Sequence, residues 1–308
     1  MSIPRGVHTV ALGALVVLLL ELFSPGSVRA TANRSGPSAT PSGSARCGPS
    51  PRLEPDDFPR APEVENKFFP LVPGTEYTLQ GSVGSTRHRI VTTVTDLTKT
   101  VDGVRAIVVF DRDLDGNRIQ ESELFFEAED DHGAVWNLGE YPEEYDNGKL
   151  AGAPNTWIAG QRGARAGFSM LADPRAGGDP YLQGIAHRIG FEDCARVVKA
   201  GQRTCVPVGC YGRVLVTDEW APRDPEGGHQ RKFYAPGVGT VRVEPVGGVD
   251  PETLQLVSIR HLCGSALAEV RGEALEQDAR GYRLSPDVYG HTSHARQTLE
   301  THHCARGM

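Results

Sequence analysis

Short apolar and alternating stretches, separated by turn-forming residues, dominate the chain from residue 66 to residue 262. The stretches Ile90–Leu97 and Val104–Phe110 are rich in β-branched residues, and an Asp-Gly pair follows each of them. Such a pair between two stretches of this kind is a strong signal for a hairpin turn. Because no long helical pattern separates the stretches, parallel βαβ units are not expected. The pattern predicts a mainly β fold, a single antiparallel meander that forms a barrel, a half-barrel or a sandwich.

One C-terminal helix is predicted near residues 266–279. Leu267, Val270 and Leu275 fall on one stripe at helical spacing, and Gly281 follows the pattern as a stop signal. The stripe predicts a helix that packs with one face on the sheet.

Residues 151–190 are rich in Gly, Ala and Arg and show little periodicity. This stretch predicts a long loop or a lid-like excursion, and loops of this length are more often functional or disordered than neutral.

Residues 1–30 have the pattern of a secretory signal peptide. Val10–Leu20 is an apolar run that ends at Glu21, and Val28 and Ala30 stand at the −3 and −1 positions of a cleavage site. A membrane-spanning helix needs about 20 apolar residues, so this run is short for a span. We expect cleavage and export, with no transmembrane span afterwards. An uncleaved membrane anchor is the alternative.

The next segment, residues 31–62, is rich in Ser, Pro and Gly and nearly free of large apolar side chains. Such a composition cannot bury enough apolar surface to offset the entropy of ordering, so it predicts a disordered tether. The β-rich domain is then expected over residues 63–283, including the helix. A flexible tail that contains histidines is expected over residues 284–308.

The composition narrows the classes of function. The 308 residues carry a formal net charge of −7, which argues against nucleic-acid binding, because that class normally shows a basic surface. With 39% hydrophobic residues, the chain is too polar for a bundle of membrane helices. Its 36 Gly and 22 Pro favour many turns and few long helices.

Six cysteines in a chain that is expected to be exported make disulfide bonds the default prediction. Cys194, Cys205 and Cys210 lie close together in the sequence, and we predict at least one bridge among them. The cysteines of the tether and of the tail can pair with each other, pair with Cys263, or remain unpaired.

Asp111, Asp113 and Asp115 precede Gly116 with the spacing of the first half of a calcium-binding loop. The second half is missing, because position twelve is Ser122 instead of a bidentate glutamate. A polar hairpin tip is therefore the favoured interpretation of this motif.

The tail provides a second set of candidate metal ligands, of a type that suits zinc or copper. They are His291, His294, His302 and His303. Histidines also cluster in disordered termini that have no function, so both interpretations stay open. No cofactor is predicted.

The chain contains no Gly-x-Ser-x-Gly elbow, phosphate-binding loop or HExxH helix, and no catalytic residue is assigned. Carboxylates are abundant, and a pair of them in a cleft could perform acid–base chemistry. Most of them stand at alternating positions or in turns, which predicts a solvated rim, whereas Trp136 and Trp220 are predicted core residues. The carboxylates are Glu127, Glu129, Asp130, Asp131, Glu140, Glu143 and Glu144.

Four stretches resemble a group of uncharacterised exported bacterial proteins. They are Asn66–Tyr77, Ala134–Glu140, Thr217–Trp220 and Tyr234–Gly239. The resemblance implies a signal-peptide or lipoprotein start, a short polar tether and a β-rich body, with an ordinary Asp-Gly hairpin at the aspartate motif. It implies no activity, cofactor or catalytic residue.

The sequence therefore favours a secreted or cell-envelope protein that binds an apolar or small ligand without catalysis. A curved antiparallel sheet can enclose an apolar groove, and no catalytic motif competes with this interpretation. An extracellular hydrolase that uses acidic residues such as Glu140 and Glu219 is one alternative. A structural or protein-interaction module with an envelope protein as partner is the other.

Overall fold

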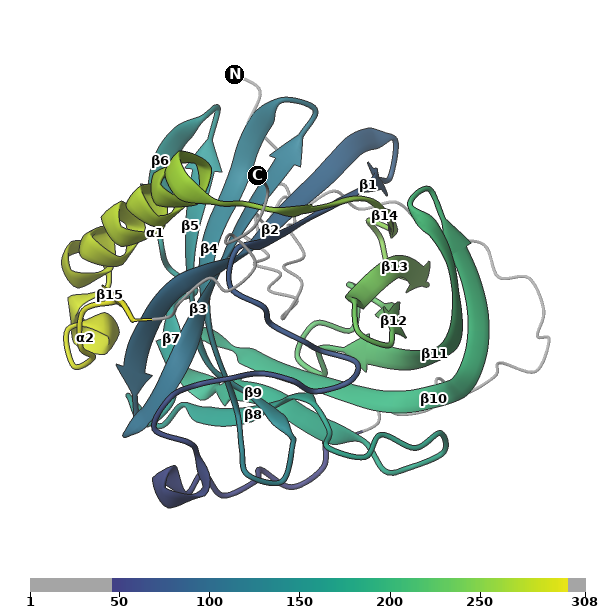
Figure 1. Cartoon of the computed structure of the whole chain (residues 1–308), viewed down its shortest axis with the longest axis horizontal. Coiled ribbons are helices and arrows are strands. Elements are labelled where there is room, and N and C mark those ends of the chain that lie inside the picture. Colours follow the sequence, from purple (N-terminus) through teal and green to yellow (C-terminus); the bar gives the residue numbers. More distant parts are fainter. Residues whose placement is uncertain (1–45, 299–308) are drawn as a thin grey trace, which may run out of the picture.

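The computed structural model of the chain describes residues 46–298, which form an extended antiparallel sheet with helices on its outside (Figure 1). The strands are β1 (Thr75–Val83), β2 (Thr86–Val101), β3 (Val104–Asp115), β4 (Arg118–Glu129), β5 (Val135–Asp146), β6 (Lys149–Gly152), β7 (Trp157–Ile158), β8 (Arg165–Met170), β9 (Tyr181–Ala186), β10 (Phe191–Val206), β11 (Gly209–Trp220), β12 (His229–Ala235), β13 (Gly239–Val246), β14 (Glu252–His261) and β15 (Arg296–Gln297). The α-helices are α1 (Gly264–Leu284) and α2 (Pro286–Tyr289), and short 3-10 helices cover Pro55–Asp57 and His187–Ile189.

Twelve strands close into an antiparallel barrel. Their order around the wall is β1-β14-β13-β12-β11-β10-β9-β8-β5-β4-β3-β2, and β1 also pairs with β2, which joins the two edges (Figure 1). Closure pairs the edges that an open sheet would expose. The barrel is one of the three architectures that the sequence pattern predicts.

Predicted hairpin turns lie where the sequence places them. Asp102 and Gly103 join β2 to β3 with φ angles of 47° and 84°, and Asn147 and Gly148 join β5 to β6 with φ angles of 53° and 75°. Two successive positive φ angles define the turn type that matches the twist of a two-residue hairpin, and Asp-Gly and Asn-Gly tolerate it best.

Both faces of the barrel wall are buried along β4. Leu124 and Phe126 belong to an apolar cluster that includes residues of α1, on the outside of the barrel. Phe125 belongs to a second cluster, to which strands from all around the wall contribute. Since neighbouring residues of a strand point to opposite faces, Glu123 and Glu127 point inwards. The apolar stripe of β4 therefore faces the helix, and its acidic stripe faces the barrel interior.

Helix α1 confirms the prediction of a C-terminal helix and extends it at both ends. Leu267, Val270 and Ala274 are buried on its inner face. They belong to the outer apolar cluster, over the wall that β2 to β5 form (Figure 1).

Residues 46–62 are ordered, although the sequence assigns them to a disordered tether. A disulfide joins Cys47 to Cys194 of β10. Leu53 and Phe58 pack on the outer apolar cluster, and the ring centroid of Phe58 lies 5.9 Å from that of Trp136. A covalent link and two apolar anchors thus order a segment whose average composition is polar. Residues 31–45 lie outside the described part of the chain.

Residues 151–190 contribute two strands of the wall, so the prediction of a long loop or a lid-like excursion is wrong. Strands β8 and β9 stand between β5 and β10. Glycines explain the missing alternation: a Cβ at Gly167 would lie 2.4 Å from the carbonyl oxygen of Leu182, and one at Gly184 would lie 2.8 Å from the ring of Trp157. Close packing requires glycine at these strand positions.

The described part of the predicted tail, residues 284–298, is also structured. Helix α2 buries Tyr289 against the outer cluster, and β15 pairs with β2. Neither α-helix within residues 46–298 has the length and apolar composition that a membrane crossing requires.

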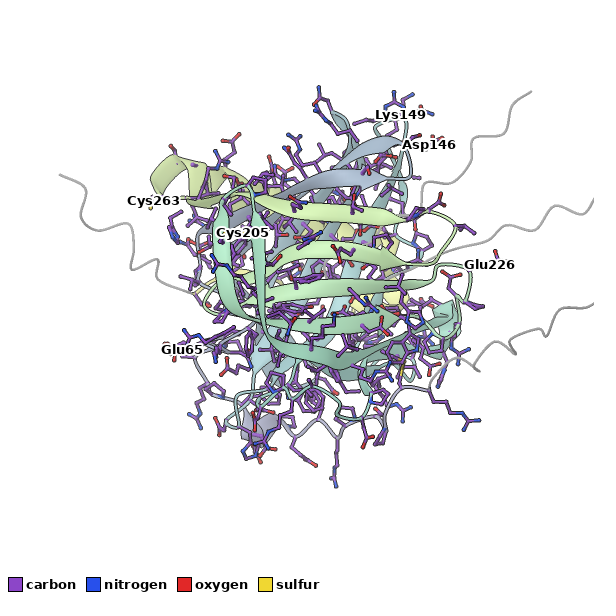
Figure 2. All side chains as sticks on the ribbon, turned by 90° about the vertical axis from the view of Figure 1, so that its right-hand side faces the viewer. Glu65, Asp146, Lys149, Cys205, Glu226 and Cys263 are labelled. Atoms are coloured by element: carbon purple, nitrogen blue, oxygen red, sulfur yellow. A yellow bond between two sulfur atoms is a disulfide. The ribbon has the colours of Figure 1, made fainter. Side chains whose placement is uncertain are left out.

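The barrel has two ends, which a side view separates (Figure 2). Glu65, Cys205 and Cys263 lie towards one end, and Asp146 and Glu226 lie towards the other. We refer to them as the Glu65 end and the Glu226 end.

Candidate functional site

A pocket lined by inward-facing residues occupies the barrel. Its cavity volume is about 60 Å³. Leu79, Val109 and Phe125 contribute apolar walls, and Asp111 and Glu127 contribute carboxyl groups. Typical small-molecule sites have volumes of about 300–1,000 Å³, so the enclosed space is small and a larger ligand would also occupy the open mouth of the pocket.

Residues 64–71, which we call the plug, form part of the pocket lining and cross the barrel towards the Glu65 end (Figures 1 and 2). Phe69–Leu71 contact the pocket. The side-chain amide of Asn66 donates to the carbonyl oxygen of Gly133 at 2.7 Å, and its backbone N–H donates to Glu129 at 2.7 Å. The plug is therefore fixed by hydrogen bonds to the β4–β5 turn and to the end of β4.

Carboxyl groups of neighbouring strands stand opposite one another on the inner face. Asp111 of β3 pairs in register with Glu123 of β4, and Asp113 pairs with Glu121. Glu121 in turn stands opposite Glu144 of β5. We call these five residues the acidic ladder. Like charges at opposed positions destabilise a sheet, so the ladder requires protons or a positively charged partner.

Burial raises the pKa values of carboxyl groups on the inner face of β4. For Glu121 and Glu123 the pKa lies well above its usual range, first because of burial and then because of neighbouring carboxylates. Burial raises the pKa of Glu127 to about 8, although Ser169 opposes the rise by donating to both carboxyl oxygens, at 2.9 and 2.8 Å. Glu127 is therefore mostly neutral at pH 7, and a neutral carboxyl can donate as well as accept a hydrogen bond.

Several polar atoms of the interior are buried without a hydrogen-bond partner. Among them are Oε2 of Glu123, Oγ1 of Thr92 and the hydroxyl of Tyr181. The exposed fractions of Glu123 and Tyr181 are 2% and 7%. Because nearly all buried polar atoms in proteins are hydrogen-bonded, these atoms indicate a partner that the protein does not supply.

Glu140 and Glu219, the two carboxylates that the sequence offers to a hydrolase, both lie inside the barrel near Lys232. The ammonium of Lys232 lies 2.9 Å from Glu219. Burial raises the pKa of Glu140 to about 7, while hydrogen bonds from Trp157 and Asn137 and the charge of Lys232 oppose the rise. The carboxyl group of Glu140 therefore accepts hydrogen bonds from Asn137 and Trp157, and Lys232 forms an ion pair with Glu219.

His88 forms a separate buried cluster. Its Nδ1 lies 3.0 Å from Asp115, and its Nε2 lies 3.1 Å from Asp113 and 3.2 Å from Glu252. Burial alone would lower the pKa of His88, but hydrogen bonds and charges from Asp113 and Glu252 outweigh it and raise the pKa to about 11. His88 is thus a cation that neutralises carboxylates of β3 and β14.

The aspartates of the calcium-like motif, Asp111, Asp113 and Asp115, lie in the last part of strand β3. Asp111 lines the pocket, whereas Asp113 and Asp115 contact His88. Residues 46–298 contain no group of three or more His, Cys, Asp or Glu side chains placed to hold a metal ion.

The histidines of the tail are not brought to the pocket by the described structure. The ring of His294 lies against Tyr282, with 4.1 Å between centroids, and His291 is exposed. His302 and His303 lie outside the described residues.

Disulfide bonds link the N-terminal segment to the barrel and close one of its hairpins. Cys205 pairs with Cys210 across the β10–β11 hairpin, whereas Cys194 pairs with Cys47 instead of with either of its sequence neighbours. Cys263 is also disulfide-bonded, and the described residues include no free cysteine.

Sequence reasoning missed the interior carboxyls. The prediction of a solvated rim is wrong for Glu127, Glu140 and Glu143, which are buried. Trp136 and Trp220 are buried, as predicted. The alternation of acidic and apolar residues in β4 was visible in the sequence. The predicted helix was the only sign that the apolar face of β4 could be covered from outside the barrel.

No protein-family model matches the chain, and no curated protein matches its sequence. Two solved structures are similar to it. One, from Bacteroides fragilis, is provisionally described as an exported protein with a YmcC-like fold; it shows 14% identity and a TM-score of 0.35 over 63% of this chain and 99% of its own. The other, provisionally described as a lipoprotein from Parabacteroides distasonis, shows 13% identity and the same TM-score and coverage. At this level of similarity, neither protein bears on function.

Proposed function

We propose that this is an exported binding protein that holds a small amphipathic ligand inside its barrel. The apolar part of the ligand would lie between the plug and the walls at Leu79, Val109 and Phe125. Its polar head would face the carboxyl groups of Asp111 and Glu127. The observation that carries the proposal is a mainly apolar pocket whose lining includes the buried carboxyl groups of Asp111 and Glu127.

Two further observations support binding. The orphaned polar atoms of Glu123 and Thr92 need a hydrogen-bonding partner. Strongly perturbed carboxyl pKa values, such as those of Glu121 and Glu123, cluster at functional sites.

A hydrolase has less support. The two acids proposed for it already have partners: Glu140 accepts from Asn137 and Trp157 at 2.6 and 3.0 Å, and Glu219 contacts Lys232. A general acid or base needs access to a proton of its substrate. No feature of the described residues favours the third alternative, a structural or protein-interaction module, over ligand binding.

Fluorescence titration with N-phenyl-1-naphthylamine, an apolar dye, tests the proposal. We expect saturable binding that Val109→Trp abolishes, because the larger ring fills the pocket. Val249→Trp is the matched control, since Val249 is 64% exposed, and it should bind the dye as the parent protein does. Circular dichroism establishes that both variants fold.

Native mass spectrometry of gently purified protein provides a second measurement. A co-purifying small molecule that Val109→Trp loses would support the proposal. Absence of any bound molecule, together with dye binding that Val109→Trp leaves intact, would overturn it.

A further inference from the structure

We propose that a groove on the outside of the barrel binds the phosphate group of a small organic molecule through Arg89, Arg112 and Arg260. These residues stand on β2, β3 and β14, and they line one cavity of about 260 Å³. This cavity is separate from the pocket inside the barrel, so binding here goes beyond the proposed function and does not depend on it.

The groove and the interior pocket lie on opposite faces of the same wall. On β3, Asp111 lines the pocket and Arg112 lines the groove. On β2, Thr92 lines the pocket and Val91 lines the groove. Since neighbouring residues of a strand point to opposite faces, the groove opens on the outside of the barrel.

Strand register brings the three arginines to this groove. Arg112 stands opposite Val91 of β2, and Arg89 lies two residues from Val91 on the same face, so Arg89 and Arg112 are diagonal neighbours. Arg260 stands opposite Glu76 of β1. Nη2 of Arg112 lies 3.7 Å from Glu76, and Arg260 also forms an ion pair with Glu76. Glu76 therefore holds Arg112 and Arg260 at the same side of the cavity.

The positive charge of the groove exceeds the negative charge that contacts it. Within residues 46–298, Glu76 and Glu273 are the carboxylates that form ion pairs with the three arginines, and both contact Arg112. Nε of Arg89 is buried without a hydrogen-bond partner, and so is Nε of Arg112. Because nearly all buried polar atoms in proteins are hydrogen-bonded, these donors indicate an acceptor that the protein does not supply.

The lining of the groove indicates which anion it would accept. Guanidinium groups form charge-assisted hydrogen bonds with phosphate and carboxylate oxygens. The arginines stand on three different strands, and a phosphate monoester offers three terminal oxygens to them, whereas a carboxylate offers two. The cavity is also larger than a bare phosphate requires, and Val91, Leu114 and Ile119 contribute apolar lining. The ligand should therefore carry a compact apolar group beside its phosphate.

Small probes with different head groups test this proposal. We would titrate the protein with phenyl phosphate, benzoate, benzyl alcohol and inorganic phosphate in a calorimeter. Phenyl phosphate should bind at least tenfold more tightly than benzyl alcohol, because only the anion forms charge-assisted hydrogen bonds. Inorganic phosphate should bind more weakly than phenyl phosphate, because it leaves the apolar lining uncovered. Added NaCl should weaken the binding of phenyl phosphate, because salt screens the charges.

The variant Arg89→Gln removes the guanidinium whose Nε has no partner, so the fold should tolerate it. Its affinity for phenyl phosphate should fall at least tenfold. Arg89→Lys should keep part of the affinity, because it retains the charge and loses the planar fork. Arg105→Gln, exposed at the start of β3 and away from the groove, is the matched control and should bind as the parent protein does. Circular dichroism establishes that the variants fold.

The outcomes distinguish this site from the interior pocket. Arg89→Gln should leave dye binding unchanged, and Val109→Trp should leave the binding of phenyl phosphate unchanged. Loss of phenyl phosphate binding in Val109→Trp would place the probe inside the barrel and overturn the outer site.

Three further results would contradict the proposal. If benzyl alcohol binds as tightly as phenyl phosphate, or if Arg89→Gln binds phenyl phosphate as Arg105→Gln does, the anion site is overturned. If benzoate binds more tightly than phenyl phosphate, the assignment to phosphate is overturned. If inorganic phosphate binds as tightly as phenyl phosphate, the assignment to an organic phosphate is overturned.

Discussion

Individual buried charges in this barrel depend on a few specific partners. His88 gathers carboxylates from two strands, Asp113 and Asp115 from β3 and Glu252 from β14. Its side chain is 1% exposed, so its charge is removed from water. A buried cation in this position stabilises the fold only while its carboxylates surround it, and they depend on it equally.

Replacing His88 by Gln tests this dependence. The variant leaves Asp113 and Glu252 buried without their cation, and it should lose about 3–5 kcal/mol of unfolding free energy near pH 8. The loss should be smaller near pH 5, because Asp113, whose pKa is already raised to about 7, can then be neutral. Urea unfolding at both pH values measures the difference.

His132→Gln is the control for this experiment, since His132 is exposed in the β4–β5 turn. It should change the stability by less than about 0.5 kcal/mol. An equal loss for His88→Gln at both pH values would contradict the electrostatic explanation.

At the scale of elements, a buried lysine attaches the C-terminal helices to the outside of the barrel. Lys99 of β2 donates to Asp278 of α1 at 2.8 Å and to the carbonyl oxygen of Ser293 at 2.6 Å. Its ammonium also lies 4.1 Å from the ring centroid of Tyr289 in α2. Burial lowers the pKa of Lys99, and the charge of Asp278 and its hydrogen bond oppose this effect.

Lys99→Met should cost about 3–5 kcal/mol, because it leaves Asp278 as an uncompensated buried charge. Adding Asp278→Asn to this variant should restore part of the loss, since the amide keeps the shape without the charge. Chemical denaturation of the two single variants and the double variant gives the coupling energy. Lys149→Met, in an exposed hairpin, is the control, and additive losses for Lys99 and Asp278 would contradict a direct pair.

At the scale of the whole molecule, the protonated acids of the interior make stability depend on pH. In the fold, the pKa of Glu127 is about 8 and those of Asp113 and Glu140 are about 7, and burial raises all three above their usual range. A group with a raised folded pKa contributes its full stabilisation below the unfolded pKa and loses it as the pH rises to the folded pKa. The affected range is therefore about pH 4 to pH 8.

The protein should consequently be more stable near pH 5 than near pH 8. Each group that stays protonated in the fold costs about 1.4 kcal/mol per pH unit within its range, and His88 contributes in the same direction at higher pH. Together these groups predict a lower Tm at pH 8 than at pH 5. Thermal unfolding followed by circular dichroism in buffers of equal ionic strength measures this shift.

Glu127→Gln should reduce that pH dependence, because glutamine does not titrate. A Tm that rises from pH 5 to pH 8 would mean that the interior acids are ionised in the fold.

The sequence by itself determined the local structure of this protein. Alternation and β-branched runs located β2, β3 and β4, the Asp102-Gly103 and Asn147-Gly148 pairs located hairpins, and a helical stripe located α1. These features depend on interactions between residues close together in the chain, which a pattern can represent. The sequence pattern did not reveal strands β8 and β9, because close packing requires glycine at positions where a side chain would have shown the alternation.

Only the tertiary structure decided which face of each strand lies inside. Alternation shows that a strand such as β4 has two unlike faces, and the apolar one is expected to face the core. Here α1 covers the apolar face from outside, and closure of the barrel buries Glu123 and Glu127 within. Burial of a face depends on elements far away in the sequence. The candidate site therefore becomes visible only when the barrel is closed and the helix is in place.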